Sequence, residues 1–169
     1  HAVARLEDLR RRLEAAYAAP AGWLGRLRGL GRREIPGERG VYLWGGVGRG
    51  KTFLMDLFRG SLTVASRRDH FHRFMRDVHG RLRGLRELES PLERVAADIA
   101  VDTRVLCLDE LFVSDIADAM LLSGLFSGLV DRGVTLVFTS NTPPAGLYRD
   151  GLQRSRFLPA IALLERCTE

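Results

Sequence analysis

The sequence predicts an α/β fold in which a parallel sheet is covered by helices on both faces. Short apolar runs, typical of buried strands, alternate along the chain with longer segments whose apolar residues recur at helical spacing. The apolar runs also lack the polar–apolar alternation of a strand with one exposed face. The chain has 169 residues, 46% of them apolar, which suits one domain with a substantial core.

The first half of the chain begins with an amphipathic segment at residues 2–18, which predicts a helix. Residues 19–38 are rich in Gly, Pro and Arg and are expected to connect this helix, as one unit of residues 1–38, to a core at 39–169. The core then shows patterns for a strand at 40–44, a helix including 53–58, a strand at 69–74, a charged helix at 75–88, and a helix at 90–99 with Ser90 as cap and Pro91 at its first position.

The second half repeats the alternation of strand and helix. Its helix after the third strand has two candidate caps, Ser114 and Asp115. In order, the expected elements are a strand at 104–110, a helix at 114–132, a strand at 134–141, a turn or short helix at 143–150, and a helix at 156–167.

Composition narrows the class of protein. The net charge is +5, and 25 of the 26 basic residues are arginine, leaving Lys51 as the single lysine; Asn141 is likewise the single asparagine. Residues retained against such a bias are candidates for function, because Lys and Arg are not equivalent chemically. Cys107 lies in an apolar run, which predicts a buried thiol. The use of cysteine also predicts a reducing, cytoplasmic compartment. The longest apolar run is too short to span a bilayer, which leaves peripheral membrane association open.

A glycine-rich loop follows the first predicted strand and precedes a predicted helix, and it matches the pattern G-x-x-x-x-G-K-[ST]. In such a loop the backbone N–H groups turn toward phosphate oxygens, the lysine reaches the β and γ phosphates, and the hydroxyl ligates Mg²⁺. A P-loop NTPase is therefore predicted, with ATP and Mg²⁺ as cofactors; GTP is disfavoured because the chain has no N-K-x-D motif. The loop comprises Gly45, Gly46, Val47, Gly48, Arg49, Gly50, Lys51 and Thr52.

Three polar residues close the predicted strands that should flank this loop. Asp109 ends the run "VLCLDE", where a carboxylate can hold Mg²⁺, and Glu110 follows as the candidate general base. Side-chain alternation on a strand would direct the two carboxylates to different targets. Asn141 ends the fourth strand and could bind the γ-phosphate or the attacking water; the alternative is a turn residue before Thr142 and Pro143.

Two other groups of residues raise weaker hypotheses. His70 and His72 share one face of the strand expected at 69–74, but no further Cys or His completes a metal site, so structural or interaction histidines are favoured. Arginine-rich stretches at 5–13, 26–33 and 67–86 could contact nucleic acid, although such runs are more often solvated faces.

With these motifs the chain resembles the ZapE family of AAA+ ATPases, which has mitochondrial relatives. The resemblance rests on "YLWGGVGRGKTFLMDLF", "HFHRFM", "VLCLDELFVSDIADAMLL" and "TSNTPPAGLYRDGLQRSRFLPAI". It implies that residues 45–52 are Walker A, Asp109 and Glu110 are Walker B, and Asn141 is sensor 1. It also implies an AAA+ type sheet, and a chain that stops before the family's fifth strand and C-terminal lid.

The resemblance further implies an arginine finger within "SRF" at residues 155–157, with Arg156 as first and Arg154 as second candidate. The alternative is an arginine at a helix start that pairs with Asp150. By the same resemblance the full-length protein is expected to be a homo-oligomeric ATPase that remodels a protein partner, the FtsZ cell-division ring. A nucleic-acid-directed ATPase of helicase-loader type and a nucleotide-dependent scaffold without turnover are the rival hypotheses.

Overall fold

The structure is a computed structural model that describes residues 1–18 and 37–169. Most of the connection expected at 19–38, and the arginine-rich stretch at 26–33, lie outside these residues. Within the described parts no helix has the length and apolarity needed to cross a bilayer. The elements are α1 (Ala2–Ala18), β1 (Val41–Trp44), α3 (Lys51–Ser61), β2 (Ser66–His70), α4 (Phe71–Gly84), α5 (Pro91–Ala100), β3 (Val105–Asp109), α6 (Ile116–Val130), β4 (Thr135–Ser140), the short 3-10 helices η1 (Pro144–Gly146) and η2 (Arg154–Arg156), and α7 (Leu158–Cys167).

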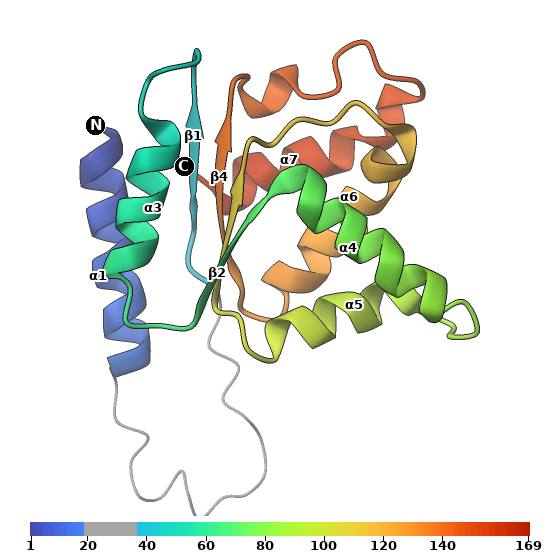
Figure 1. Cartoon of the computed structure of the whole chain (residues 1–169), viewed down its shortest axis with the longest axis horizontal. Helices are drawn as coiled ribbons and strands as arrows, with labels where there is room; N and C mark the ends of the chain where they lie inside the picture. The colour runs from blue at the N-terminus through green and yellow to red at the C-terminus, as the bar shows by residue number, and fades with distance from the viewer. Residues whose placement is uncertain (19–36) are drawn as a thin grey trace, which may run out of the picture.

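The four strands form one parallel sheet in the order β1-β4-β3-β2, with helices on both faces (Figure 1). This confirms the predicted fold class. Alternate residues of each strand enter separate cores: Leu106 and Leu108 of β3 pack with α4–α7, whereas Val105 and Cys107 pack with α1 and α3. Cys107 is fully buried as predicted, and burial raises the pKa of its thiol to about 12.

The strand predicted at 69–74 is placed wrongly. β2 covers Ser66–His70, and helix α4 begins at Phe71. Residues 71–74 of the predicted strand are instead the first turn of a helix that buries Phe71, Phe74, Met75 and Val78, the i, i+3, i+4, i+7 positions of one face. β2 itself is a charged strand, which pairs with the apolar strand β3 at one edge of the sheet.

The helix predicted at 75–88 is shifted in the same way, since α4 ends at Gly84. The later boundaries lie closer to the patterns. Pro91 occupies the first turn of α5, but the Ser90 side chain makes no capping hydrogen bond. Asp115 rather than Ser114 caps α6: its carboxylate accepts a hydrogen bond from the N–H of Ala117 at 2.5 Å.

Thr168 and Glu169, which follow α7, extend alongside β1. Thr168 bridges Gly40 in parallel, and the Tyr42 N–H donates to the Glu169 carbonyl at 2.9 Å. The Glu169 carboxylate also accepts hydrogen bonds from Arg5 and Arg12, so α1 is tied to this edge. The chain after α7 thus returns to the free edge of β1 through a single bridge.

Candidate functional site

The phosphate-binding motif forms a loop between the end of β1 and the start of α3, at the carboxyl edge of the sheet. Gly48 and Gly50 have φ of 77° and 73°, a left-handed conformation that disfavours residues with a side chain. A Cβ added at either glycine would meet no atom within 4 Å, so the space beside the loop stays open. Gly50 directly precedes α3, which places the helix N-terminus and its positive dipole at the loop.

The Lys51 ammonium lies inside this loop. Its Nζ donates to the carbonyl oxygens of Gly45 and Gly46 at 2.6 and 2.8 Å, and to Oδ1 of Asn141 at 3.3 Å. Lys51 therefore joins the motif to the residue that follows β4. The hydroxyl of Tyr42 donates to the carbonyl of Thr142 at 3.0 Å, which fixes the chain just beyond Asn141 against β1.

Asp109 is the centre of the site and is 1% exposed. Its Oδ1 accepts hydrogen bonds from the Thr52 hydroxyl at 3.0 Å and from the Thr139 hydroxyl. Its Oδ2 forms an ion pair with Arg68 of β2, with Nη2 at 2.7 Å. A buried carboxylate of this kind is stable only when it is paired and hydrogen-bonded, and donors from three neighbouring elements supply those contacts.

Glu110 lies just beyond β3, so alternation along a strand does not direct its side chain as the sequence suggested. Its φ is 58°, in the left-handed region that is costly for a residue with a side chain. This turn leaves the Glu110 side chain 71% exposed while Asp109 stays buried. His70 reaches both carboxylates loosely, with Nδ1 at 3.7 Å from Asp109 Oδ2 and 3.9 Å from Glu110 Oε2.

A cleft of about 440 Å³ brings most of the predicted site residues together. Its walls include loop residues from Val47 to Thr52, with Glu110 and Asn141 opposite. Asp109 lies beneath the cleft and is joined to it through Thr52. Residues far apart in sequence thus converge at the point where the sequence predicted one crevice.

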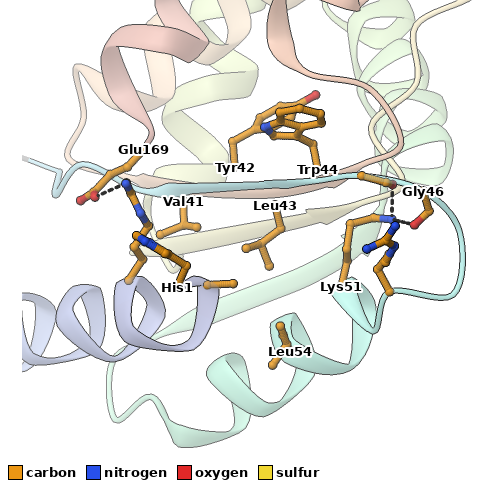
Figure 2. Close-up of a pocket in the computed structure, with 13 residues that line it drawn as sticks. His1, Val41, Tyr42, Leu43, Trp44, Gly46, Lys51, Leu54 and Glu169 are labelled. Carbon is orange, nitrogen blue, oxygen red and sulfur yellow. Dashed lines mark hydrogen bonds and ion pairs between the residues drawn. The ribbon is translucent and has the colours of Figure 1, made fainter.

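A second hollow of about 620 Å³ runs along β1 from the loop toward the N-terminus (Figure 2). Leu43 and Leu54 give it an apolar wall, and Lys51 points into its end nearest the loop. His1 and Glu169 lie at the far end. The two hollows share Arg49 and Lys51, so the loop lies between a polar cleft and a more apolar one.

The two candidate finger arginines lie outside both hollows. Arg154 is half-buried and its Nη2 donates to the Ala145 carbonyl at 2.9 Å, which links η2 to η1. Arg156 is exposed, and within the described residues it forms no ion pair, with Asp150 or any other acid. The structure therefore separates them: Arg154 holds local structure, and the Arg156 guanidinium is available to another molecule.

Sequence reasoning missed two residues that contact Asp109, namely Arg68 and Thr139. Arg68 belongs to a strand whose boundaries were misplaced, so its direction could not be inferred. Thr139 lies in an apolar run, where a threonine is an ordinary strand residue. The one available signal was its position two residues before Asn141.

The chemistry of these residues fits a nucleotide with Mg²⁺. Thr52 and Asp109 present adjacent oxygen donors, the ligand type that Mg²⁺ prefers. The open, glycine-lined loop with a cation beneath it fits phosphate groups. Within residues 1–18 and 37–169 no group of three or more His, Cys, Asp or Glu side chains is arranged to hold a metal ion.

The comparisons with known proteins agree with this geometry. The family model of the AFG1-like ATPase matches residues 1–169. The chain is 53% identical over 175 residues to "Cell division protein ZapE" of Escherichia coli K12, covering 98% of this chain and 47% of that protein. It is 45% identical over 139 residues to "Lactation elevated protein 1 homolog B" of Danio rerio, covering 75% of this chain and 28% of that protein.

Among solved structures, the crystal structure of DnaI superposes with a TM-score of 0.59 at 18% identity, covering 85% of this chain and 74% of that one. This likeness shows the fold. The chain spans about half the length of the bacterial curated relative that it matches.

Proposed function

This chain belongs to the AFG1-like ATPase family, and from that premise we propose that it binds Mg²⁺-ATP on the loop of residues 45–52 and takes part in its hydrolysis. One observation carries the proposal. Lys51 and Thr52 at the start of α3, Asp109 at the end of β3 and Asn141 after β4 come from three separate segments. Direct hydrogen bonds join Lys51 to Asn141 and Thr52 to Asp109 at one cleft. A glycine-rich turn with only a structural role would need neither Lys51 inside the loop nor the buried Asp109 carboxylate bonded to the Thr52 hydroxyl.

In this proposal the residues divide the chemistry among them. Lys51 leaves the carbonyls of Gly45 and Gly46 for the β and γ phosphates, whose negative charge is the stronger partner. Asp109 and Thr52 would hold Mg²⁺, which would neutralise part of the phosphate charge when bound. Glu110, exposed in the same cleft, takes the proton of the attacking water, and Asn141 orients that water or the γ-phosphate.

The nucleoside part has a place in the hollow along β1. This hollow begins at Gly45, Gly46 and Lys51 and has an apolar wall, which suits a base and ribose. The phosphates would then lie between the two hollows, over the loop.

Replacing Lys51 by Ala is expected to weaken ATP binding by about tenfold to a hundredfold, because a charge-assisted hydrogen bond to phosphate is lost. Lys51→Arg should also bind poorly, since a wide fork does not fit the space of an ammonium held by two carbonyls. Titration with a fluorescent ATP analogue measures both variants. Arg59→Ala, which removes an exposed cation from the same helix, is the control and should bind normally. Wild-type affinity in both Lys51 variants would remove the assignment of the loop.

We propose a protein client and a homo-oligomeric state for the full-length protein. The relative from Escherichia coli is named as a cell-division protein, which supports a client in that process, and the resemblance to its family suggests FtsZ polymers. An exposed Arg156 without an ion-pair partner among the described residues supports a neighbouring subunit at η2.

A nucleic-acid-directed ATPase is the second candidate, and the surface of α4 favours it. Arg67, Arg73, Arg76 and Arg81 line a hollow of about 660 Å³ beside α4. Arg67 pairs with Asp69 at 2.6 Å and Arg81 pairs with Asp77 at 3.1 Å. Arg73 and Arg76 are exposed and form no ion pair within residues 37–169. Two free guanidinium groups beside a hollow can bind phosphates of a polyanion.

ATPase assays of the full-length protein separate the two candidates. We expect stimulation by FtsZ polymers to exceed stimulation by DNA at physiological salt. The replacement Arg73→Glu with Arg76→Glu should leave the FtsZ response intact and abolish any residual response to DNA, because repulsion replaces attraction for phosphate. Stimulation by DNA alone, lost in this double variant, would reverse the ranking of the two candidates.

A further inference from the structure

Thr139 lies at the point where the metal-binding carboxylate and the general base meet. It belongs to β4 and is 1% exposed. Its hydroxyl donates to Oδ1 of Asp109 and accepts a hydrogen bond from the backbone N–H of Glu110 at 2.9 Å. One side chain therefore contacts the carboxylate of Asp109, which ends β3, and the backbone of Glu110, which follows it.

The chemistry of a hydroxyl makes these two contacts dependent on each other. A threonine hydroxyl has one proton and two lone pairs, and an ionised carboxylate can only accept. The proton must therefore point at Asp109, which leaves a lone pair for the Glu110 N–H. If either contact is lost, the hydroxyl can rotate and the other contact loosens.

The backbone of Thr139 strengthens the same arrangement. Its carbonyl accepts from the Leu111 N–H at 2.7 Å, so Thr139 contacts the chain on both sides of Glu110. Glu110 has φ of 58°, a conformation that costs energy and persists only when its surroundings fix it. The hydrogen bonds from Glu110 and Leu111 to Thr139 hold this turn, together with the bond from the Ser140 hydroxyl to the Leu111 carbonyl at 2.7 Å.

We infer that Thr139 is a positioning residue that sets the Mg²⁺-binding carboxylate of Asp109 and the direction of Glu110 together. This inference rests on the proposed ATPase function. Without the hydroxyl, Asp109 keeps Thr52 and Arg68 as partners, and the attraction of the arginine draws the carboxylate away from the Mg²⁺ position. The Glu110 N–H is left without its acceptor, so the turn that presents the base loses the one restraint that acts on Glu110 directly.

The test compares Thr139→Val, which removes the hydroxyl at nearly constant shape, with Thr139→Ser, which retains it. Thr135→Val is a matched control: Thr135 is a threonine of the same strand, also 1% exposed, whose hydroxyl accepts from a backbone N–H, that of Glu38. It lies at the opposite end of β4, away from the site.

Affinity for a fluorescent ATP analogue is measured with Mg²⁺ and with EDTA, alongside kcat and KM of ATP hydrolysis in the full-length protein. All variants should bind equally in EDTA, because the loop is untouched. The Mg²⁺ gain is the factor by which Mg²⁺ raises the affinity for the ATP analogue over that in EDTA. In Thr139→Val this factor should fall by about tenfold or more, and kcat should fall by about 10²-fold. Thr139→Ser and Thr135→Val should keep both.

A Thr139→Val protein with wild-type Mg²⁺ gain and kcat would overturn the inference, as would equal losses in Thr139→Ser or in Thr135→Val. Thermal unfolding identifies a variant that does not fold; Thr139→Ala, which removes the same hydroxyl with less bulk, carries the same expectation in that case. A wild-type protein that shows neither ATP binding nor an Mg²⁺ gain would contradict the proposed function itself, independently of Thr139.

Discussion

Arg156→Ala in the full-length protein is expected to slow ATP hydrolysis by about 10³ to 10⁵-fold, the range for an arginine finger. Arg156 is exposed in η2, lies outside the cleft at the loop, and has no ion-pair partner among the described residues. In the proposed oligomer its guanidinium therefore serves a neighbouring subunit, where it would neutralise charge on the γ-phosphoryl group as the bond to the β-phosphate breaks. Arg149→Ala removes an exposed arginine from the same region and should remain active.

A mixing experiment identifies a finger that acts between subunits. The Arg156→Ala protein keeps its own nucleotide site, and the Lys51→Ala protein keeps its fingers. The mixture should recover ATPase activity that neither variant shows alone. An inactive mixture that co-assembles by size-exclusion chromatography, or a fully active Arg156→Ala protein, would count against this position of Arg156. Arg154→Ala should instead lower the melting temperature, because Arg154 links η2 to the Ala145 carbonyl.

Glu110→Gln is expected to retain Mg²⁺-ATP binding and to lose about 10² to 10⁴-fold in the rate of hydrolysis. An amide preserves the shape of the side chain but cannot accept the proton of the attacking water. Binding should survive because Glu110 lies at the wall of the cleft, whereas Asp109 beneath it is the residue in contact with Thr52. Single-turnover hydrolysis and analogue titration measure the two properties separately.

Glu87→Gln is the control for this variant, since Glu87 is exposed and remote from the cleft. It should hydrolyse ATP at the wild-type rate. A collapse of Mg²⁺-ATP binding in Glu110→Gln would show instead that Glu110 is a metal ligand. An unchanged rate would assign the base to another residue, and His70, whose Nδ1 is 3.9 Å from Glu110, would be the next candidate.

Much of the site could be predicted because its signals are local. The loop at 45–52 is a continuous motif between a strand and a helix, and Asp109 follows a continuous apolar run. Since carboxyl ends of parallel strands share one edge, these segments could be expected to meet. The hydrogen bond between Lys51 and Asn141 shows that the end of β4 also lies beside the loop at 45–52.

The missed features depend on which strands are neighbours, and a single sequence does not state this. Thr139 reaches Asp109 because β4 lies beside β3, and Arg68 reaches it because β2 lies on the other side. The left-handed turn at Glu110 was equally hidden, because glutamate gives no local sign of positive φ. Tertiary contacts, rather than local preference, impose that conformation.

The strand order also governs when the nucleotide loop can assemble during synthesis. Within the described sheet, β1 hydrogen-bonds to β4, with Val41 opposite Val137, so its neighbour is translated about 100 residues later. At ribosomal rates of about 5 to 20 residues per second, the loop would wait roughly 5 to 20 seconds for the strand that supports it. The segment that emerges early is thus among the last to acquire its native contacts. A nascent chain released before β4 would carry the complete phosphate-binding motif and yet lack the sheet that holds it in a form able to retain nucleotide.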